Sequence, residues 1–252
     1  KPYRGLQIFE WIHNKGVTDF NSMTNLGSDL VEKLKQNSKI EVPEVVDISI
    51  SSEGTKKFLL KLDNDSFIEM VKIPEKNRQT LCISSQAGCA LQCSFCATGF
   101  NGFKRNLTSS EIISQLWLAN YYKNDSERVS NVVFMGMGEP LMNTENVLKT
   151  ISIMQDQKCY SLSKRRITLS TSGIVPQIDA ITGKTDVSLA ISLHASNDDL
   201  RNKIVPINKK YPIKDLLSSS KKYLKSLSSK SYITIEYILI KDLNDSIKDA
   251  KN

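Results

Sequence analysis

The stretch Thr80-Leu-Cys-Ile-Ser-Ser-Gln-Ala-Gly-Cys-Ala-Leu-Gln-Cys-Ser-Phe-Cys96 decides which fold and which chemistry the sequence predicts. Its beginning, residues 80–84, has the composition of a short strand bounded by polar residues. A glycine and three cysteines follow, and a helix is predicted over residues 109–122. Thr108 and Glu111 have the spacing of a capping box at the start of that helix. The segment therefore predicts a strand, a cysteine-containing loop and a helix, in that order.

The chain repeats this order after the first unit. Further strands are predicted at residues 131–135, 166–170, 186–193 and 232–240, with helices between them. Five strands that alternate with helices predict an α/β fold with a parallel sheet and right-handed crossovers. The apolar run from Val132 to Met135 is typical of a strand buried on both faces. Periodicity leaves open whether the sheet curls into a barrel, but in either case the chemistry is expected on the loops that leave the C-terminal strand ends.

The N-terminal part of the chain has a different rhythm. Two helical patterns occupy the first forty residues, and Pro43 marks a change of period. Three alternating segments then predict an antiparallel meander. The expected division is a helical accessory region at 1–42, a β meander at 43–79 and the main α/β core at 80–252.

Composition and charge narrow the class of protein. The 252 residues are 40% hydrophobic and 24% charged, which is ordinary for a globular protein. There is no apolar run near the ~18 residues of a membrane span, and the N-terminus lacks signal-peptide features. We therefore expect a cytoplasmic protein. The net charge of +7 favours a polyanionic partner such as RNA, although a lysine-rich solvated surface would give the same charge.

The cysteines give the strongest chemical signal. Five is an odd number, and three of them fall within eight residues, which favours metal or redox chemistry over a disulfide framework. Cys89, Cys93 and Cys96 could converge on one iron–sulfur cluster, since thiolates are its usual ligands. Structural zinc needs four closed ligands, so zinc would require a distant fourth such as Cys159. That alternative stays open, as does a set of three inert buried cysteines.

The other predicted strand ends also lead into unusual polar and glycine residues, so four successive exits describe one composite site. The motifs at the three exits after the cysteine loop are Met135-Gly-Met-Gly-Glu-Pro-Leu141, Leu169-Ser-Thr-Ser-Gly173 and Ile191-Ser-Leu-His-Ala195. A further motif, Val205-Pro-Ile-Asn-Lys-Lys210, follows a predicted helix.

The cysteine spacing resembles the signature of radical S-adenosylmethionine (SAM) enzymes. Together with the other motifs, the chain resembles the RlmN family of dual-specificity RNA methyltransferases over nearly its whole length. This resemblance implies a partial, TIM-like (βα) barrel. It also implies methylation of C2 of an adenosine in 23S rRNA and in tRNA, with a 4Fe–4S cluster and SAM as cofactors. An electron donor such as flavodoxin and a monomeric state are expected.

The resemblance also implies a role for individual residues. The cluster ligands would be Cys89, Cys93 and Cys96, and the proposed contacts to SAM are Gly138, Glu139, Ser170, Ser192, Leu193 and His194. Cys82 would be a resolving cysteine that forms a disulfide, and Glu69 a proton acceptor. Each has a simpler alternative: a helix-terminal carboxylate for Glu139, a hydrogen-bonded core residue for His194, a small core side chain for Cys82 and an exposed strand carboxylate for Glu69.

One feature departs from the family pattern. The methyl-carrying cysteine of the family is expected beyond Asn252, and no cysteine follows Cys159. We therefore expect this chain to bind the cluster without completing methyl transfer. Two rival functions are a Cfr-type C8 methyltransferase, disfavoured by Pro140 after Gly-Glu, and a non-enzymatic RNA-binding module that holds zinc.

Overall fold

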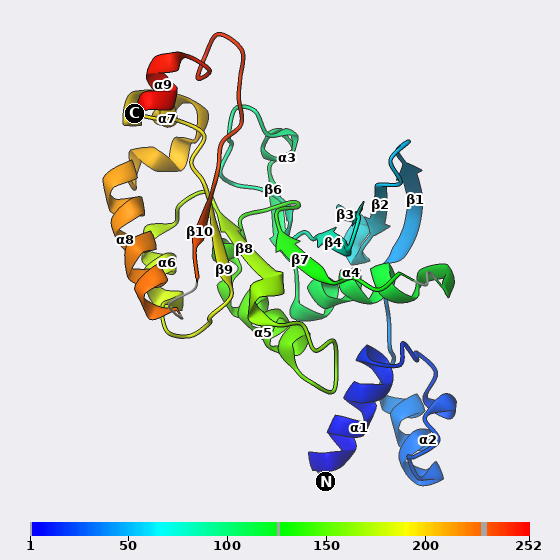
Figure 1. Cartoon of the computed structure of the whole chain (residues 1–252). Coiled ribbons are helices and arrows are strands. Elements are labelled where there is room, and N and C mark those ends of the chain that lie inside the picture. Colours follow the sequence, from blue (N-terminus) through cyan, green and yellow to red (C-terminus); the bar gives the residue numbers. More distant parts are fainter. Residues whose placement is uncertain (1, 125–126, 228–230) are drawn as a thin grey trace.

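The computed structural model describes residues 2–124, 127–227 and 231–252. In these ranges the central element is an eight-stranded sheet with the order β1-β2-β3-β4-β7-β8-β9-β10 (Figure 1). Its strands are β1 (Glu44–Ile50), β2 (Lys56–Lys61), β3 (Phe67–Glu75), β4 (Arg78–Cys82), β7 (Asn131–Phe134), β8 (Ile167–Thr171), β9 (Ser188–Ser192) and β10 (Ile233–Glu236). A separate hairpin consists of β5 (Gln86–Gly88) and β6 (Phe103–Asn106).

The sheet has an antiparallel half and a parallel half that meet at β4. Strands β1 to β3 form the predicted meander, and β4, the predicted first strand of the core, pairs antiparallel with β3 and parallel with β7. The remaining pairs, β7–β8, β8–β9 and β9–β10, are also parallel, which confirms the predicted five-stranded α/β core. Within the described residues no pairing joins β1 to β10, so the parallel strands form a partial barrel rather than a closed one.

Helices connect the parallel strands and cover one side of the sheet (Figure 1). In chain order, the described helices are α1 (Pro2–His13), α2 (Ser28–Asn37), α3 (Ala97–Phe100), α4 (Ser109–Tyr121), α5 (Thr144–Gln155), α6 (Val175–Ile181), α7 (Asp198–Ile204), α8 (Ile213–Ser226) and α9 (Ile247–Lys251). Of these, α1 and α2 precede the sheet and α9 follows its last strand. The capping box of Thr108 and Glu111 is present at α4, as predicted. Asn143 precedes α5, but its side chain donates to the carbonyls of Ser85 (2.9 Å) and Leu107 (2.7 Å) instead of capping the helix.

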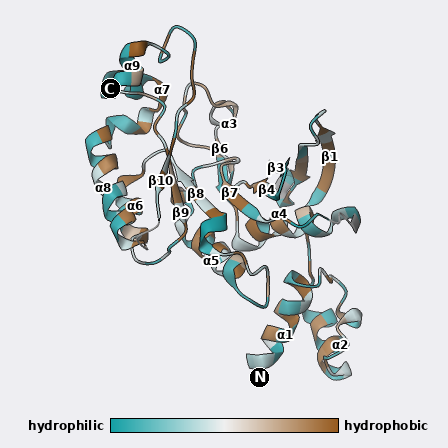
Figure 2. Cartoon of the chain, in the orientation of Figure 1, coloured by the Kyte–Doolittle hydropathy of each residue, from teal (hydrophilic) through white to brown (hydrophobic). Residues whose placement is uncertain are grey.

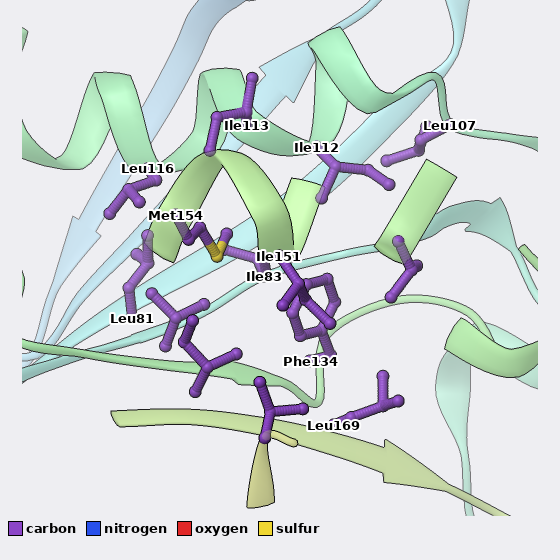
Figure 3. Packing of buried hydrophobic residues seen from close by; sticks show 14 of the residues in the cluster. Leu81, Ile83, Leu107, Ile112, Ile113, Leu116, Phe134, Ile151, Met154 and Leu169 are labelled. Atoms are coloured by element: carbon purple, nitrogen blue, oxygen red, sulfur yellow. The ribbon is translucent and has the colours of Figure 1, made fainter. Parts of the chain in front are cut away.

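The two faces of the parallel half differ in chemistry. Leu81, Phe134 and Leu169 point to the helices and pack with Ile151 and Met154, among others (Figure 3). The register places Thr80, Cys82, Val133, Thr168 and Ser188 together on the opposite face, where all five are only half-buried. The prediction that β7 is buried on both faces is therefore wrong. The open face is lined by small and polar side chains that leave room above the sheet.

The first forty residues form a small helical unit with its own core around Phe20, Met23 and Leu26. Hydrogen bonds connect it to the rest of the chain: Trp117 Nε1 donates to the carbonyl of Ile12 at 2.9 Å. His13 Nδ1 lies 3.1 Å from the hydroxyl of Tyr160. The meander, by contrast, shares the main core through Phe58, Leu60, Ile68 and Met70.

Two other predictions differ from the structure. The predicted strand at 232–240 shortens to Ile233–Glu236, because a loop held by the buried amide of Asn244 follows it. Asn244 Oδ1 accepts from the N–H of Ile240 at 2.6 Å, and its Nδ2 donates to the carbonyl of Ile238 at 2.7 Å. Apolar β-branched residues do not distinguish such a loop from a strand.

Helix α8 buries a narrower face than its leucines suggest. The sequence predicts an inward face formed by the leucines at 216, 217, 224 and 227. Only Leu216 is fully buried, while Leu217, Leu224 and Leu227 are half-buried. Tyr223 and two serines fill the remaining contacts. Figure 2 shows hydrophilic and hydrophobic residues alternating along α5 and α8, as expected for helices that cover a sheet with one face. In the described part of the chain, no helix is long and apolar enough to cross a membrane.

Candidate active site

A pocket of about 290 Å³ lies at the C-terminal ends of the parallel strands. Its wall consists of residues from the loop between β5 and β6 and from the exits of β7, β8, β9 and β10. Among the predicted site residues, it brings together Cys89, Cys93, Cys96, Gly138, Glu139, Ser170, Ser192 and His194. The convergence predicted from successive strand exits is therefore observed.

The cysteine loop is held at its neck and at its tip. At the neck the N–H of Cys89 donates to the carbonyl of Gly102 at 3.0 Å. Gly88 has φ +77, and a Cβ there would lie 1.8 Å from that same carbonyl oxygen, so only glycine permits this approach. At the tip the N–H of Ser94 donates to the carbonyl of Ile204 on α7 at 3.0 Å. This backbone hydrogen bond docks the cysteine loop against α7.

The three thiols share one electrostatic environment. Burial, with a further contribution from the neighbouring Cys89 and Cys96, raises the pKa of Cys93 to about 11. Burial also raises the pKa of Cys89. A raised pKa means that burial favours the protonated thiol. Bound iron would have the opposite effect, because a coordinating cation favours the thiolate. Within the described ranges no three His, Cys, Asp or Glu side chains are placed to share a single ion, so the thiols surround the pocket without meeting at one point.

The exit of β7 combines close backbone packing with a buried carboxylate. Gly138 has φ +97, and a Cβ there would lie 2.5 Å from Cβ of Gln86. Glu139 is only 2% exposed, and burial raises its pKa. Its Oε1 accepts from the N–H of Leu141 at 3.1 Å, which caps the short 3₁₀ turn Pro140–Met142. Its Oε2 accepts from the N–H of Ser172 at 2.8 Å. Glu139 therefore caps a helical turn and lines the pocket at the same time.

His194 lies at the exit of β9 with a left-handed backbone, φ +60. Its Nδ1 accepts from the N–H of Ile238 at 3.1 Å, so a neutral ring carries its proton on Nε2. Burial and the charge of Arg201 lower its pKa to about 4. The ring packs edge-on against Phe95 of the cysteine loop, with centroids 4.8 Å apart. It is a hydrogen-bonded packing residue that also lines the pocket.

Cys82 and Glu69 do not line this pocket. Cys82 pairs with Val71, and Glu69 precedes Val71 by two residues, so both side chains point to the open face of the sheet. Diagonal neighbours of this kind lie roughly 7–8 Å apart. Burial raises the pKa of Cys82 to about 11. Glu69 forms an ion pair with Lys57, with 2.9 Å between Oε1 and Nζ.

Known proteins match nearly the entire chain. A sequence profile of the Radical SAM superfamily matches residues 83–251, and a profile described as the ribosomal RNA large subunit methyltransferase N-terminal domain matches residues 1–40. The dual-specificity RNA methyltransferase RlmN of Pseudomonas putida strain F1 is 52% identical over 99% of this chain and 67% of its own length. This chain belongs to the RlmN family of radical SAM methyltransferases.

Other relatives agree with that assignment. RlmN of Pseudomonas fluorescens strain SBW25 is 51% identical over 99% of this chain and 67% of its own length. A crystal structure of a radical SAM methyltransferase from Sphaerobacter thermophilus superposes with a TM-score of 0.91 at 38% identity. The match covers 99% of this chain and 73% of that one. The protein is thus an enzyme of a family that uses a 4Fe–4S cluster and SAM.

The pocket fits both RlmN-family cofactors in its donor set. Three thiols face it from one loop, which matches cluster ligation with one position left open. Gly136 and Gly138 bring backbone to its wall, while Ser170, Ser192 and Glu139 offer polar groups that a nucleoside and an amino acid require. Leu193, the remaining predicted SAM contact, is not among the residues that line the pocket. Its carbonyl accepts a hydrogen bond from Arg201 Nε at 2.9 Å.

Sequence reasoning missed Ser172 and Arg201. Ser172 lines the pocket, and Arg201 lies behind it with no exposed surface. Ser172 lies in one of the predicted strand-exit loops, and this position could have identified it as a site residue. The arginine falls among charged residues of a short amphipathic helix, where the local pattern is that of a solvated side chain.

Proposed function

We propose that this protein methylates C2 of an adenosine in 23S rRNA and in tRNA, with its cluster on Cys89, Cys93 and Cys96. The observation that carries the proposal is the pocket at the strand exits, where these three thiols face Gly138, Glu139 and His194. When bound, the cluster and SAM would supply a carbon-centred radical, which can react with an electron-poor adenine carbon that polar methyl transfer does not reach.

The protein's own residues would orient and shield these groups. The glycines at 136 and 138 allow close backbone approach, and Ser170 and Ser192 offer hydroxyls on the open face of the sheet. His194 is neutral near pH 7 because its pKa is lowered to about 4, so its Nε2–H is available as a donor. Leu193 would contribute to SAM binding through its backbone, whose carbonyl is held in place by a hydrogen bond from Arg201 Nε.

Glu69 and Cys82 would serve the adenosine rather than the cofactors. They lie on the open face beside the pocket, one strand apart. Glu69 would accept the proton that leaves the methylated carbon, and Lys57 Nζ lies 2.9 Å from its Oε1. Cys82, with its pKa raised to about 11, is a thiol at neutral pH. As the resolving residue it would lose its proton and attack the sulfur that links the methyl-carrying cysteine to the adenosine. The disulfide would form as that carbon–sulfur bond breaks, and the carbon would keep the electron pair and take up a proton to become the methyl group.

Substrate and setting follow from the same proposal. RNA substrates agree with the net charge of +7, since lysine and arginine bind phosphates without sequence preference. We place the protein in the cytoplasm, where rRNA and tRNA are found, as a monomer that takes electrons from a flavodoxin-type donor.

The test is anaerobic reconstitution with iron and sulfide, reduction, and incubation with SAM and RNA. We expect a brown protein that produces 5′-deoxyadenosine. When the chain is tested in a protein that also supplies the methyl-carrying cysteine, we expect RNA whose digest contains 2-methyladenosine. Glu69→Gln should lower methylation by roughly 100-fold while 5′-deoxyadenosine still forms, as expected for the loss of a general base. A colourless protein with stoichiometric zinc would overturn the proposal, and 8-methyladenosine in the digest would identify the Cfr-type alternative.

A further inference from the structure

Arg201 is a fully buried cation with no buried counter-charge in contact. It extends from α7 and is 0% exposed. Nε donates to the carbonyl of Leu193 at 2.9 Å, and Nη1 donates to Oδ1 of Asn208 at 2.8 Å. Nη2 donates to the carbonyls of Ser172 at 2.7 Å and Ser192 at 3.0 Å. All four acceptors are neutral, and Arg201 forms no salt bridge with any residue in the described ranges.

The nearest acidic residue of α7 is connected to Arg201 only indirectly. Asn208 lies between them, since its Nδ2 donates to Oδ1 of Asp198 at 2.8 Å while its Oδ1 accepts from Arg201. Burying a cation among neutral acceptors is costly unless a negative charge arrives nearby. The fold therefore contains a buried positive charge at a fixed place that no carboxylate of the described residues contacts directly, although Cys93 and Asp198 lie near enough to act on it electrostatically.

One residue, Ser172, separates this charge from the pocket. The carbonyl of Ser172 accepts from Arg201, and the N–H of Ser172 donates to Oε2 of Glu139 at 2.8 Å. The Ser172 side chain lies close enough to the Cys93 thiol to lower its pKa. Arg201 thus stands directly behind a proposed cluster ligand and holds the loop that touches it.

The same guanidinium aligns two strand exits. Its contacts to Ser172 and Ser192 join the loops after β8 and β9, both of which line the pocket. A planar fork with donors in fixed directions can hold several carbonyls at once, which a lysine ammonium does less well.

We propose that Arg201 is a positioning residue that eases reduction of the cluster: its buried charge offsets the negative charge of the thiolate-ligated iron. The inference rests on the proposed function, because it assumes the cluster on Cys89, Cys93 and Cys96. A cluster held by thiolates becomes more negative when it accepts an electron, and net charge and burial set its potential. A fixed cation in a site of low dielectric constant therefore favours the reduced form.

The test compares three variants by redox titration of the reconstituted protein, followed by electron paramagnetic resonance. Arg201→Met removes the charge and keeps a long side chain. Arg201→Lys keeps the charge but loses the planar guanidinium that donates to several carbonyls at once. Tyr223→Phe, on α8, is the matched control, since it removes a buried hydrogen bond from the Tyr223 hydroxyl to the carbonyl of Val187 (2.9 Å). We expect the equilibrium constant for one-electron reduction to fall about tenfold in Arg201→Met, a shift of about 59 mV. It should change less than about threefold in Arg201→Lys and Tyr223→Phe.

Iron content and the melting temperature of the iron-free protein separate the outcomes. If Arg201→Met holds a full cluster at the wild-type potential, the inference is wrong and the proposed function stands. If it folds like Tyr223→Phe but loses iron while Arg201→Lys retains it, the charge requirement is supported. If Arg201→Met does not fold, Arg201→Gln, which keeps one amide donor, takes its place under the same criteria. A wild-type protein that binds no cluster removes the proposed function itself.

Discussion

The N-terminal helical unit and the strand-exit pocket each contain one of the two histidines, and the two sites use burial differently. Burial lowers the pKa of both His13 and His194 to about 4. His13 ends α1 in regular helical geometry and joins that unit to the core through Tyr160. His194 adopts φ +60 between β9 and the loop after β10 and faces a pocket.

The comparison shows that a shifted pKa does not by itself identify a functional residue. Desolvation shifts both histidines, and Gly16 near His13 also combines a positive φ with a close contact to Tyr121. Between these two described sites, the strand exits differ in having a buried carboxylate, Glu139, and a buried guanidinium, Arg201. We expect changes at the pocket to affect chemistry with little effect on docking of the N-terminal unit, and changes at the His13 contact to do the reverse.

The largest expected effect is the loss of the cluster in Cys93→Ala. A direct ligand should matter at least as much as the outer contacts of a metal site, so we expect iron content and 5′-deoxyadenosine formation to fall by roughly 100-fold or more. Iron analysis and chromatography of the nucleoside measure this. Cys159→Ala is the control, because Cys159 is a buried cysteine outside the pocket. Equal loss of iron in both variants would contradict the assigned ligands.

The next effect is steric and is expected in Gly138→Ala. A Cβ at this position would meet Gln86 at 2.5 Å in a backbone with φ +97, so both overlap and backbone strain oppose it. We expect a loss of about 3 kcal/mol in the free energy of unfolding, together with weaker SAM binding. Gly183→Ala has φ +79 with no atom within 4 Å, and should lose only about 1 kcal/mol. Urea titrations measure the free energy of unfolding of the two variants. Equal losses would show that the Gln86 side chain can move aside at little cost.

A pH effect of similar size is expected from His13. Its folded pKa of about 4 lies below the ordinary 6.5, so the unfolded chain binds more protons between these values. The free energy of unfolding is therefore complete above pH 6.5 and falls as pH drops toward 4. Since one pKa unit corresponds to about 1.36 kcal/mol, the 2.5-unit difference gives at most about 3 kcal/mol.

The variant His13→Gln isolates this contribution. We expect its unfolding free energy to depend less on pH between 6.5 and 4 than that of the wild-type protein, by up to the same amount. His194 and the carboxylates remain in both proteins, so their contributions cancel in the difference. Parallel pH profiles for the two proteins would contradict a buried neutral His13.

The smallest effect is expected at the other contact of the N-terminal unit. Trp117→Phe removes the hydrogen bond to the carbonyl of Ile12 and should cost about 1 kcal/mol. Hydrogen exchange in α1 should quicken while cluster content stays unchanged. Trp11→Phe is the matched control, because its indole bonds to Asn25 within the N-terminal unit at 2.7 Å. Loss of iron in Trp117→Phe would show that docking and site are coupled.

Much of the architecture could be predicted from local pattern. The meander, the five parallel strands, the capped start of α4 and the cysteine loop all have signals within a few residues of one another. The failures share a cause in long-range packing. Asn143 has the identity of a cap, but two distant carbonyls take its side chain. The loop after Glu236 has the composition of a strand, but Asn244 folds it away from the sheet.

By itself, the sequence determined the order of the elements and the chemical groups delivered by each strand exit, because both depend on neighbouring residues. The order of the strands also indicated that their exits share one site, but the tertiary structure alone decided which individual groups are in contact there. Arg201 contacts Ser172 across 29 positions of the chain, and Ser172 contacts Glu139 across 33. A charge becomes buried, and so able to act on a neighbouring site, only when segments remote in sequence close around it.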